Sequence, residues 1–126
     1  MGEKIRNFYD LKVWKDAHSL VLQIYKITKY FPSDEKFGLT NQIRRAVSSV
    51  SANIAEGFGR FHFKDKIKFY HQARGSAVEL QNHLILGKDL GYLDNTTAKN
   101  LFSQAELVLK EMNGLIASIN RQQDSI

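Results

Sequence analysis

The sequence predicts an all-α protein that folds as an antiparallel up-down-up-down four-helix bundle. Apolar residues recur every three or four positions through four long segments. Short turn-forming segments separate these four, and the 126 residues include a single proline and eight glycines, a composition that favours long helices. Four helices of roughly 20 residues, joined by short turns, pack antiparallel around one core. We therefore expect one domain over residues 1–126.

The first helix is expected over residues 10–31, with Asp10 as its N-cap. Pro32 ends it, because proline cannot donate to the preceding turn and restricts the residue before it. The buried stripe alternates spacings of four and three: Val13, Ala17, Leu20, Ile24, Ile27 and Phe31. A second apolar row flanks this stripe and is either buried within the chain or partly turned toward another subunit: Trp14, Val21 and Tyr25.

The second helix is expected over residues 39–58, with Ser33 or Thr40 as its cap. Its buried face carries Leu39, Ile43, Ala46, Val50 and Ile54. Small side chains crowd the same helix, so a neighbouring backbone can approach closely. Gly59 is expected to end the helix as a left-handed cap. Gly57 either shares that role or lies inside the helix and admits a close partner.

The third helix is expected over residues 64–89. Its buried stripe is Ile67, Tyr70, Ala73, Ala77, Leu80 and Leu84. His62 stands where a hydroxyl or carboxylate would cap the helix better. The first turns carry Lys64, Lys66 and Lys68, which the helix dipole disfavours. Such departures from helix rules are expected at functional sites, although a lysine cluster can equally be a solvated face.

The fourth helix is expected over residues 95–120, capped by Asp94, Asn95 or Thr96, and residues 121–126 are expected to fray. Its buried stripe is Ala98, Leu101, Ala105, Val108, Met112, Leu115 and Ile119. A parallel row follows at heptad spacing: Phe102, Leu109 and Ile116. The extra apolar rows on the first and fourth helices exceed what a monomeric core needs, so we expect a homo-oligomer.

Composition and charge limit the compartment and the partners. The chain has no cysteine, which excludes disulfides and thiolate chemistry. No segment reaches the roughly 18 apolar residues of a membrane-spanning helix, so we expect a cytoplasmic protein with no membrane partner. The net charge is +5, and the segment from Arg44 to Arg74 holds seven basic and two acidic residues. This concentration makes nucleic acid or another polyanion a candidate partner.

Signatures of catalysis are missing from the sequence. Metal-binding bundles place Glu and His three residues apart, whereas Glu79 and His83 are four apart. There is no nucleophile elbow and no glycine-rich phosphate loop. We therefore expect no metal, no cofactor and no enzymatic activity.

The candidate nucleic-acid-binding residues are Arg44, Arg45, Arg60, Lys64, Lys68 and Arg74, which can form one basic band where the second helix meets the third. Four aromatic residues lie among them and can either stack on unpaired bases or join the core: Phe61, Phe63, Phe69 and Tyr70. Asn53, Glu56 and Arg60 share one helical face. This polar set either fixes helix register or positions Arg60 for a phosphate. No helix suited to reading duplex sequence is recognisable.

Three segments of the chain carry a resemblance to a known family: FYDLKVWKDAH at 8–18, FPSDEKFGLTNQIRRAVSSVSANIAEGFGR at 31–60 and ARGSAVEL at 73–80. Together they resemble the 23S rRNA intervening sequence proteins, a family of bacterial four-helix bundles. The resemblance covers about residues 8–93. Related to this family are the accessory variability proteins of diversity-generating retroelements, which are basic pentamers that bind nucleic acid and associate with a reverse transcriptase.

The resemblance implies a homopentamer with a central channel that binds RNA or DNA without catalysis. The residues expected to make helix-packing and subunit contacts would then be Asn53, Glu56, Gly57, Trp14 and Tyr25. The alternative is a scaffold or accessory subunit, for example of a reverse transcriptase, that has no nucleic-acid affinity of its own.

Overall fold

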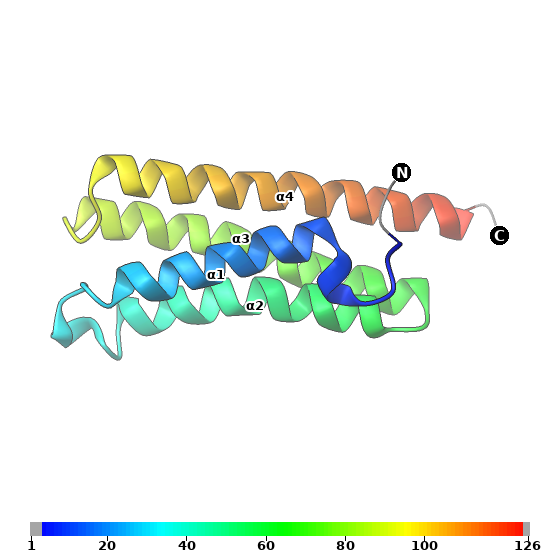
Figure 1. Cartoon of the computed structure of the whole chain (residues 1–126), viewed down its shortest axis with the longest axis horizontal. Helices are drawn as coiled ribbons and strands as arrows, with labels where there is room; N and C mark the ends of the chain where they lie inside the picture. Colours follow the sequence, from blue (N-terminus) through cyan, green and yellow to red (C-terminus); the bar gives the residue numbers. More distant parts are fainter. Residues whose placement is uncertain (1–3, 125–126) are drawn as a thin grey trace.

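Four α-helices run alternately in opposite directions and pack side by side (Figure 1). They are α1 Lys12–Thr28, α2 Leu39–Gly59, α3 Phe63–Asp89 and α4 Asn95–Asp124, with short 3₁₀ segments η1 Phe8–Asp10 and η2 Ser33–Glu35. This computed structural model describes residues 4–124, and that range contains no strand. The predicted all-α bundle is confirmed.

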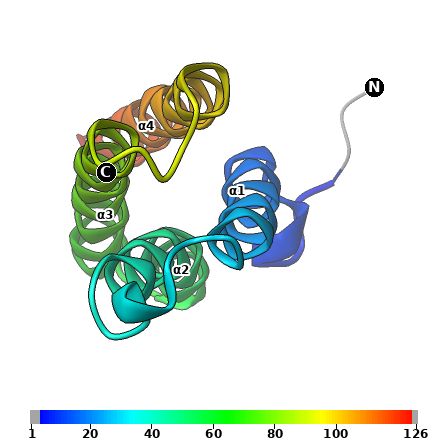
Figure 2. The same cartoon turned by 90° about the vertical axis from the view of Figure 1, so that its left-hand side faces the viewer.

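The helices follow one another around the core in chain order (Figure 2). Among neighbouring helices, packing is most extensive between α2 and α3 and least extensive between α1 and α4. The core has two clusters of buried side chains. One includes Leu20, Ile24 and Leu84, and the other, which includes Tyr70 and Met112, lies toward the α2–α3 turn. Each such side chain contributes about 1.5–3 kcal/mol when it is fully buried.

The expected bounds of the first helix were wrong at both ends. Asp10 belongs to η1, where its carboxylate accepts the N–H groups of Arg6 and Asn7. The N-cap of α1 is Leu11, without a side-chain cap. The helix ends at Thr28, before the proline takes effect, and the chain continues in a tighter turn in which the N–H groups of Tyr30 and Phe31 donate to the Ile27 and Thr28 carbonyls, each over 3.2 Å. These bonds satisfy two of the last carbonyls of α1 without further α-helix.

The predicted caps of the second helix were also wrong. Neither Ser33 nor Thr40 caps α2, because Glu35 Oε1 accepts the Leu39 N–H over 3.1 Å instead. Gly59 is the last helical residue and has no left-handed conformation, since Gly91 is the one described glycine with a positive φ, of 82°. The chain leaves α2 through Arg60 in extended conformation, with φ −77° and ψ 144°. Gly57 lies inside the helix, as one of the two alternatives proposed.

The third and fourth helices follow the expected stripes with small shifts. α3 begins one residue early, at Phe63, and its N-cap His62 makes no side-chain cap hydrogen bond. Asp94 is the cap of α4, since its Oδ1 accepts the Thr97 N–H over 2.7 Å. The expected fraying of residues 121–126 was wrong as far as Asp124, where α4 ends, and the last two residues lie outside the described range.

None of the helices described here is both long and apolar enough to cross a membrane.

Candidate functional site

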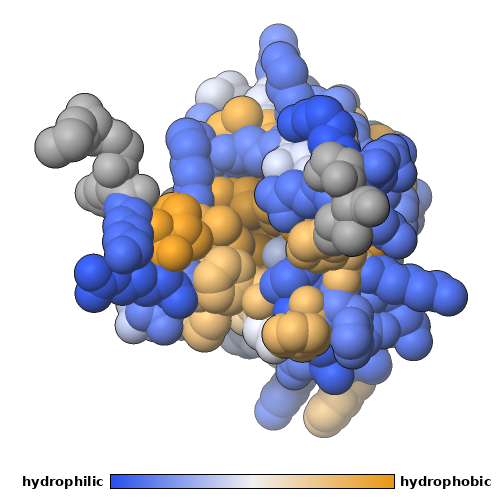
Figure 3. All heavy atoms as spheres, turned by 90° about the vertical axis from the view of Figure 1, so that its right-hand side faces the viewer, coloured by the Kyte–Doolittle hydropathy of each residue, from blue (hydrophilic) through white to orange (hydrophobic). Residues whose placement is uncertain are grey.

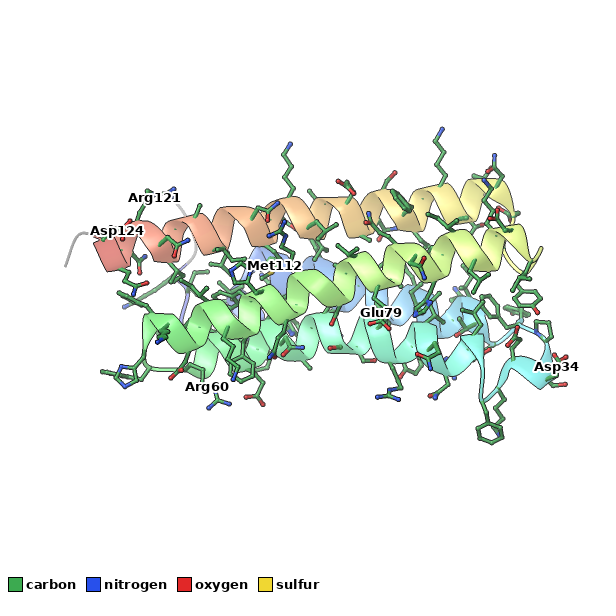
Figure 4. All side chains as sticks on the ribbon, turned by 180° about the vertical axis from the view of Figure 1, so that it is seen from behind. Asp34, Arg60, Glu79, Met112, Arg121 and Asp124 are labelled. Carbon is green, nitrogen blue, oxygen red and sulfur yellow. The ribbon has the colours of Figure 1, made fainter. Side chains whose placement is uncertain are left out.

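The α2–α3 turn brings four of the candidate residues to one end of the bundle. Residues 60–62 connect the two helices, and Lys64 and Lys68 lie one turn apart on the exposed side of α3. We call Arg60, Phe61, Lys64 and Lys68 the turn cluster. Figure 4 shows Arg60 directed away from the bundle, at the end where α4 carries Arg121, while Asp34 lies at the opposite end.

Two contacts hold the Arg60 side chain over α3. Its guanidinium carbon lies 4.4 Å from the centroid of the Phe69 ring, within the range of a cation–π interaction. Its Nη2 bonds Glu56 Oε2 over 3.1 Å. Because both partners of this ion pair are about half exposed, with side-chain exposures of 46% and 58%, the pair contributes at most about 1 kcal/mol. Arg60 is thus oriented by both contacts, and 46% of its side chain remains exposed.

Lys66 has a structural role within the same turn. Its ammonium group donates to the Phe58 carbonyl over 2.7 Å and to the Gly57 carbonyl over 3.4 Å. These are carbonyls of the last turn of α2, where a cation is favourable. Partial burial lowers the pKa of Lys66. Lys66 therefore joins α3 to the end of α2 and is excluded from the turn cluster.

The four aromatic residues near the turn divide between core and surface. Tyr70 is buried, and Phe63 and Phe69 are partly buried. Phe61 is 88% exposed. It meets the His62 ring at 90° with centroids 5.1 Å apart, a contact that engages at most one of its faces. Phe61 is therefore the ring of the four that is open to a ligand.

Arg44 ties α1 to α2. Its Nε donates to the Thr28 hydroxyl over 2.8 Å, and its Nη2 donates to the Tyr25 carbonyl over 3.2 Å. The guanidinium also lies 4.7 Å from the centroid of the Tyr25 ring. These bonds satisfy hydrogen-bond acceptors at the C-terminal end of α1, so Arg44 is a structural residue.

Arg45 and Arg74 are exposed but lie away from the turn cluster. Arg45 points about 100° around α2 from Arg44 and is about 22 Å along the helix from Arg60. Arg74 shares a side of α3 with Gln81, two turns further on. Gln81 donates to Glu106 Oε2 of α4 over 2.7 Å, so Arg74 is on the α4 side. The six predicted basic residues thus do not form one continuous band.

The polar set predicted on α2 is also divided. Glu56 pairs with Arg60, but Asn53 donates to the Ser49 carbonyl and hydroxyl over 2.8 and 3.0 Å. Ser49 in turn accepts the Ser76 hydroxyl of α3 over 2.9 Å. Asn53 therefore belongs to a network that joins α2 to α3, while Glu56 orients Arg60.

Trp14 and Tyr25, predicted at a subunit contact, both have contacts within the chain. The Trp14 ring stacks on His18 with centroids 4.6 Å apart and meets the edge of Phe8 at 5.3 Å. Tyr25 remains 41% exposed beneath Arg44.

Exposed apolar side chains on the helices are most frequent on α3. Val78, Ile85 and Leu86 are between 43% and 52% exposed, and Leu90, which follows the end of the helix, is 49% exposed. Ile85 lines a groove between α3 and α4 together with Phe102, and Lys88 and Lys99 flank it. Figure 3, which views the end with the α2–α3 turn, shows hydrophilic side chains around an apolar centre. The sequence stripes did not predict the exposed row on α3, because it runs beside the buried stripe.

The described residues contain no group of three His, Cys, Asp or Glu side chains placed to hold a metal ion. Glu79 and His83 contact each other over 3.3 Å on α3, and this pair has no third ligand. The arrangement around the turn can bind an anion and an aromatic ring, but it places no nucleophile beside a base.

Comparison with known proteins agrees with the fold. The sequence model of the 23S rRNA-intervening sequence protein family matches residues 9–114. A solved structure from Bacteroides thetaiotaomicron, described as a protein of unknown function from the S23 ribosomal protein family, superimposes with a TM-score of 0.77. It has 21% sequence identity, and the match covers 82% of this chain and 97% of that one. No curated protein sequence matches the chain.

Proposed function

The chain belongs to the family of 23S rRNA-intervening sequence proteins, and we propose that it is a non-catalytic, homo-oligomeric protein that binds nucleic acid. The observation that carries this proposal is the turn cluster. Residues 56–68 hold four cations against two carboxylates, and three of these cations, Arg60, Lys64 and Lys68, are exposed near the α2–α3 turn. A phosphate backbone is a ligand that such exposed cations attract.

Oligomerisation would strengthen this attraction. The net charge of +5 per chain is multiplied by the number of copies, so a pentamer would carry about +25. Val78 and Ile85 of α3 support association between copies, because these two exposed apolar side chains share one side of the helix. In such an assembly the turn clusters of several copies would act on one nucleic acid chain.

Salt dependence tests the proposal directly. Fluorescence anisotropy of labelled RNA and DNA, measured with the intact protein at several salt concentrations, should show affinity that falls steeply with salt. For a single strand the slope of log K against log salt is about −0.7 for each phosphate contacted. If neither RNA nor DNA shows salt-sensitive binding, the proposal fails.

Matched charge variants locate the binding surface. The triple variant Arg60→Gln, Lys64→Gln and Lys68→Gln removes three cations from the turn cluster and should abolish binding. The control Arg45→Gln, Arg74→Gln and Lys110→Gln removes three exposed cations elsewhere and should retain most of it. Arg44 is left unchanged in both variants because its loss would weaken the contact between α1 and α2. Equal losses in the two variants would remove the turn cluster from the site.

A second candidate is an accessory subunit that binds another protein, such as a reverse transcriptase. The groove between α3 and α4, which Ile85 and Phe102 line, favours this reading. Affinity capture after nuclease treatment distinguishes the two functions. Recovery of one protein in stoichiometric amount, lost in the Ile85→Lys variant, would support the accessory role, and loss of all partners with the nuclease would support nucleic-acid binding.

A further inference from the structure

Two phenylalanine rings stand out from the surface, one at each end of the bundle. Six of the eight phenylalanines are buried or partly buried. Phe37, in the α1–α2 connection, is 86% exposed, and Phe61, in the α2–α3 turn, is 88% exposed. Neither ring contributes to the core, so the fold does not require an aromatic residue at either position.

The charges around these two rings differ. Residues 29–38, which contain Phe37, hold two lysines and two carboxylates. The segment around Phe61 holds an excess of cations, and Arg60, Lys64 and Lys68 of the turn cluster are exposed. An anionic ligand with flat apolar rings is complementary to the second surface and not to the first.

We propose that the turn cluster binds single-stranded nucleic acid, an inference that rests on the proposed function. An unpaired base stacks on the ring of Phe61, and the adjoining phosphates lie at Arg60, Lys64 and Lys68. A single strand offers the faces of its bases, whereas a duplex buries them between neighbouring base pairs. Base–aromatic stacking is tolerant of sequence. The site therefore prefers single strands to duplexes and does not select a particular base.

The geometry of the turn suits this role. Arg60 and His62 both have extended backbones on either side of Phe61, and His62 engages at most one face of its ring. The stacking of Arg60 on Phe69 places a cation beside the turn before any ligand arrives. A ligand therefore meets an oriented cation and an open ring, which lowers the ordering cost of binding.

The test compares Phe61→Ala with Phe37→Ala, the same truncation of an equally exposed ring at the other end. Anisotropy is measured with labelled single-stranded oligonucleotides of RNA and of DNA and with duplexes of the same sequences. Loss of one stacked base should weaken single-strand binding about 5- to 150-fold in Phe61→Ala. Phe37→Ala should bind as the wild type does, and duplex binding should be unchanged in both variants.

Two further variants separate stacking from simple apolar contact. Phe61→Trp keeps an aromatic face and should retain affinity, whereas Phe61→Leu keeps apolar surface alone and should lose affinity as Phe61→Ala does. The slope of affinity against salt should be unchanged in Phe61→Ala, because no charge is removed, and should become shallower in Lys64→Gln. Circular dichroism and thermal melting confirm that each variant folds.

The failures of the two proposals are distinguishable. If the wild type binds single strands and Phe61→Ala binds them equally well, the stacking site is overturned and nucleic-acid binding stands. If Phe61→Ala instead loses a captured protein partner, the ring belongs to a protein contact. If the wild type binds neither RNA nor DNA, nucleic-acid binding itself fails. A wild type that prefers duplex to single strand also overturns the stacking site.

Discussion

Gly57 shows how one missing side chain determines the contact between α2 and α3. A Cβ at this position would lie 2.5 Å from Cε1 of Tyr70, so the ring occupies the space that any other residue would need. Tyr70 is 2% exposed, and burial raises its pKa to about 12. The close approach of the two helices, which also permits the Ser49–Ser76 bond, depends on this glycine.

We expect Gly57→Ala to destabilise the protein by about 1–3 kcal/mol, because the added methyl group must displace a packed ring. Gly75→Ala is the matched control, since it makes the same change inside α3 where an added Cβ would have no neighbour within 4 Å. That variant should be more stable by about 1 kcal/mol through helix propensity. Urea unfolding measures both, and equal effects of the two variants would contradict the steric account.

Individual roles within the basic set were not predictable from spacing. Arg44 and Arg45 are adjacent in sequence, but one satisfies the end of α1 and the other faces solvent. Lys66 lies between two exposed lysines and donates to carbonyls of α2. These differences follow from which side of a helix faces its neighbour. The sequence alone does not determine the rotation of each helix about its axis closely enough to predict these roles.

At the scale of the elements, helix type and position were predictable and helix ends were not. The apolar period of each segment identified all four helices, and bounds at the start of α2, the end of α3 and the start of α4 were correct. The misplaced end of α1 and the mispredicted cap of α2 depend on tertiary contacts. Arg44 reaches the end of α1 from α2, and Glu35 caps α2 while it accepts the Tyr92 hydroxyl from the α3–α4 connection.

The capping carboxylates make stability dependent on acid pH. The Thr97 N–H lowers the pKa of Asp94 below its ordinary 3.8, and the Leu39 N–H, followed by the Tyr92 hydroxyl, lowers the pKa of Glu35 below its ordinary 4.5. Because each folded-state pKa lies below the unfolded value, the stabilisation is complete above the ordinary values. It is lost as the pH falls through the lower, folded-state values.

We expect the melting temperature to fall as the pH is lowered below about 4.5, partly through loss of these caps. Asp94→Asn should melt like the wild type at pH 7, because asparagine is an equally good N-cap. Its melting temperature should fall less on acidification, since the variant has no carboxylate to protonate at this cap. Thermal melts between pH 7 and pH 2.5 compare the two proteins, and parallel curves would contradict the assignment.

At the scale of the whole molecule, the exposed aliphatic side chains of the described helices are most frequent on α3. The sequence predicted oligomerisation from the rows on the first and fourth helices, but Trp14 and Ile116 of those rows are largely occupied within the chain. Val78 and Ile85 of α3 are 52% and 51% exposed. They are one heptad apart and so share a side of the helix. We therefore expect copies to associate through this side of α3.

The variant Val78→Lys with Ile85→Lys should dissociate the assembly, because it would bury two unpaired charges at the contact. Light scattering should then report a mass near 14.5 kDa in place of a multiple of it. Leu22→Lys is the control, since Leu22 is a comparably exposed apolar residue on α1, at 59%. A wild-type protein that is monomeric in solution would contradict the proposal of self-association.

Because successive helices run in opposite directions, the fourth helix ends at the same end of the bundle where the first helix begins. Figure 1 places the start of α1 and the end of α4 at the same end as the α2–α3 turn. A purification tag or fusion partner at either terminus would therefore lie at the end that carries the turn cluster, and an acidic one would occupy its cations. Labels for binding experiments belong in the α1–α2 connection, at the far end of the bundle, where they leave Phe61 accessible.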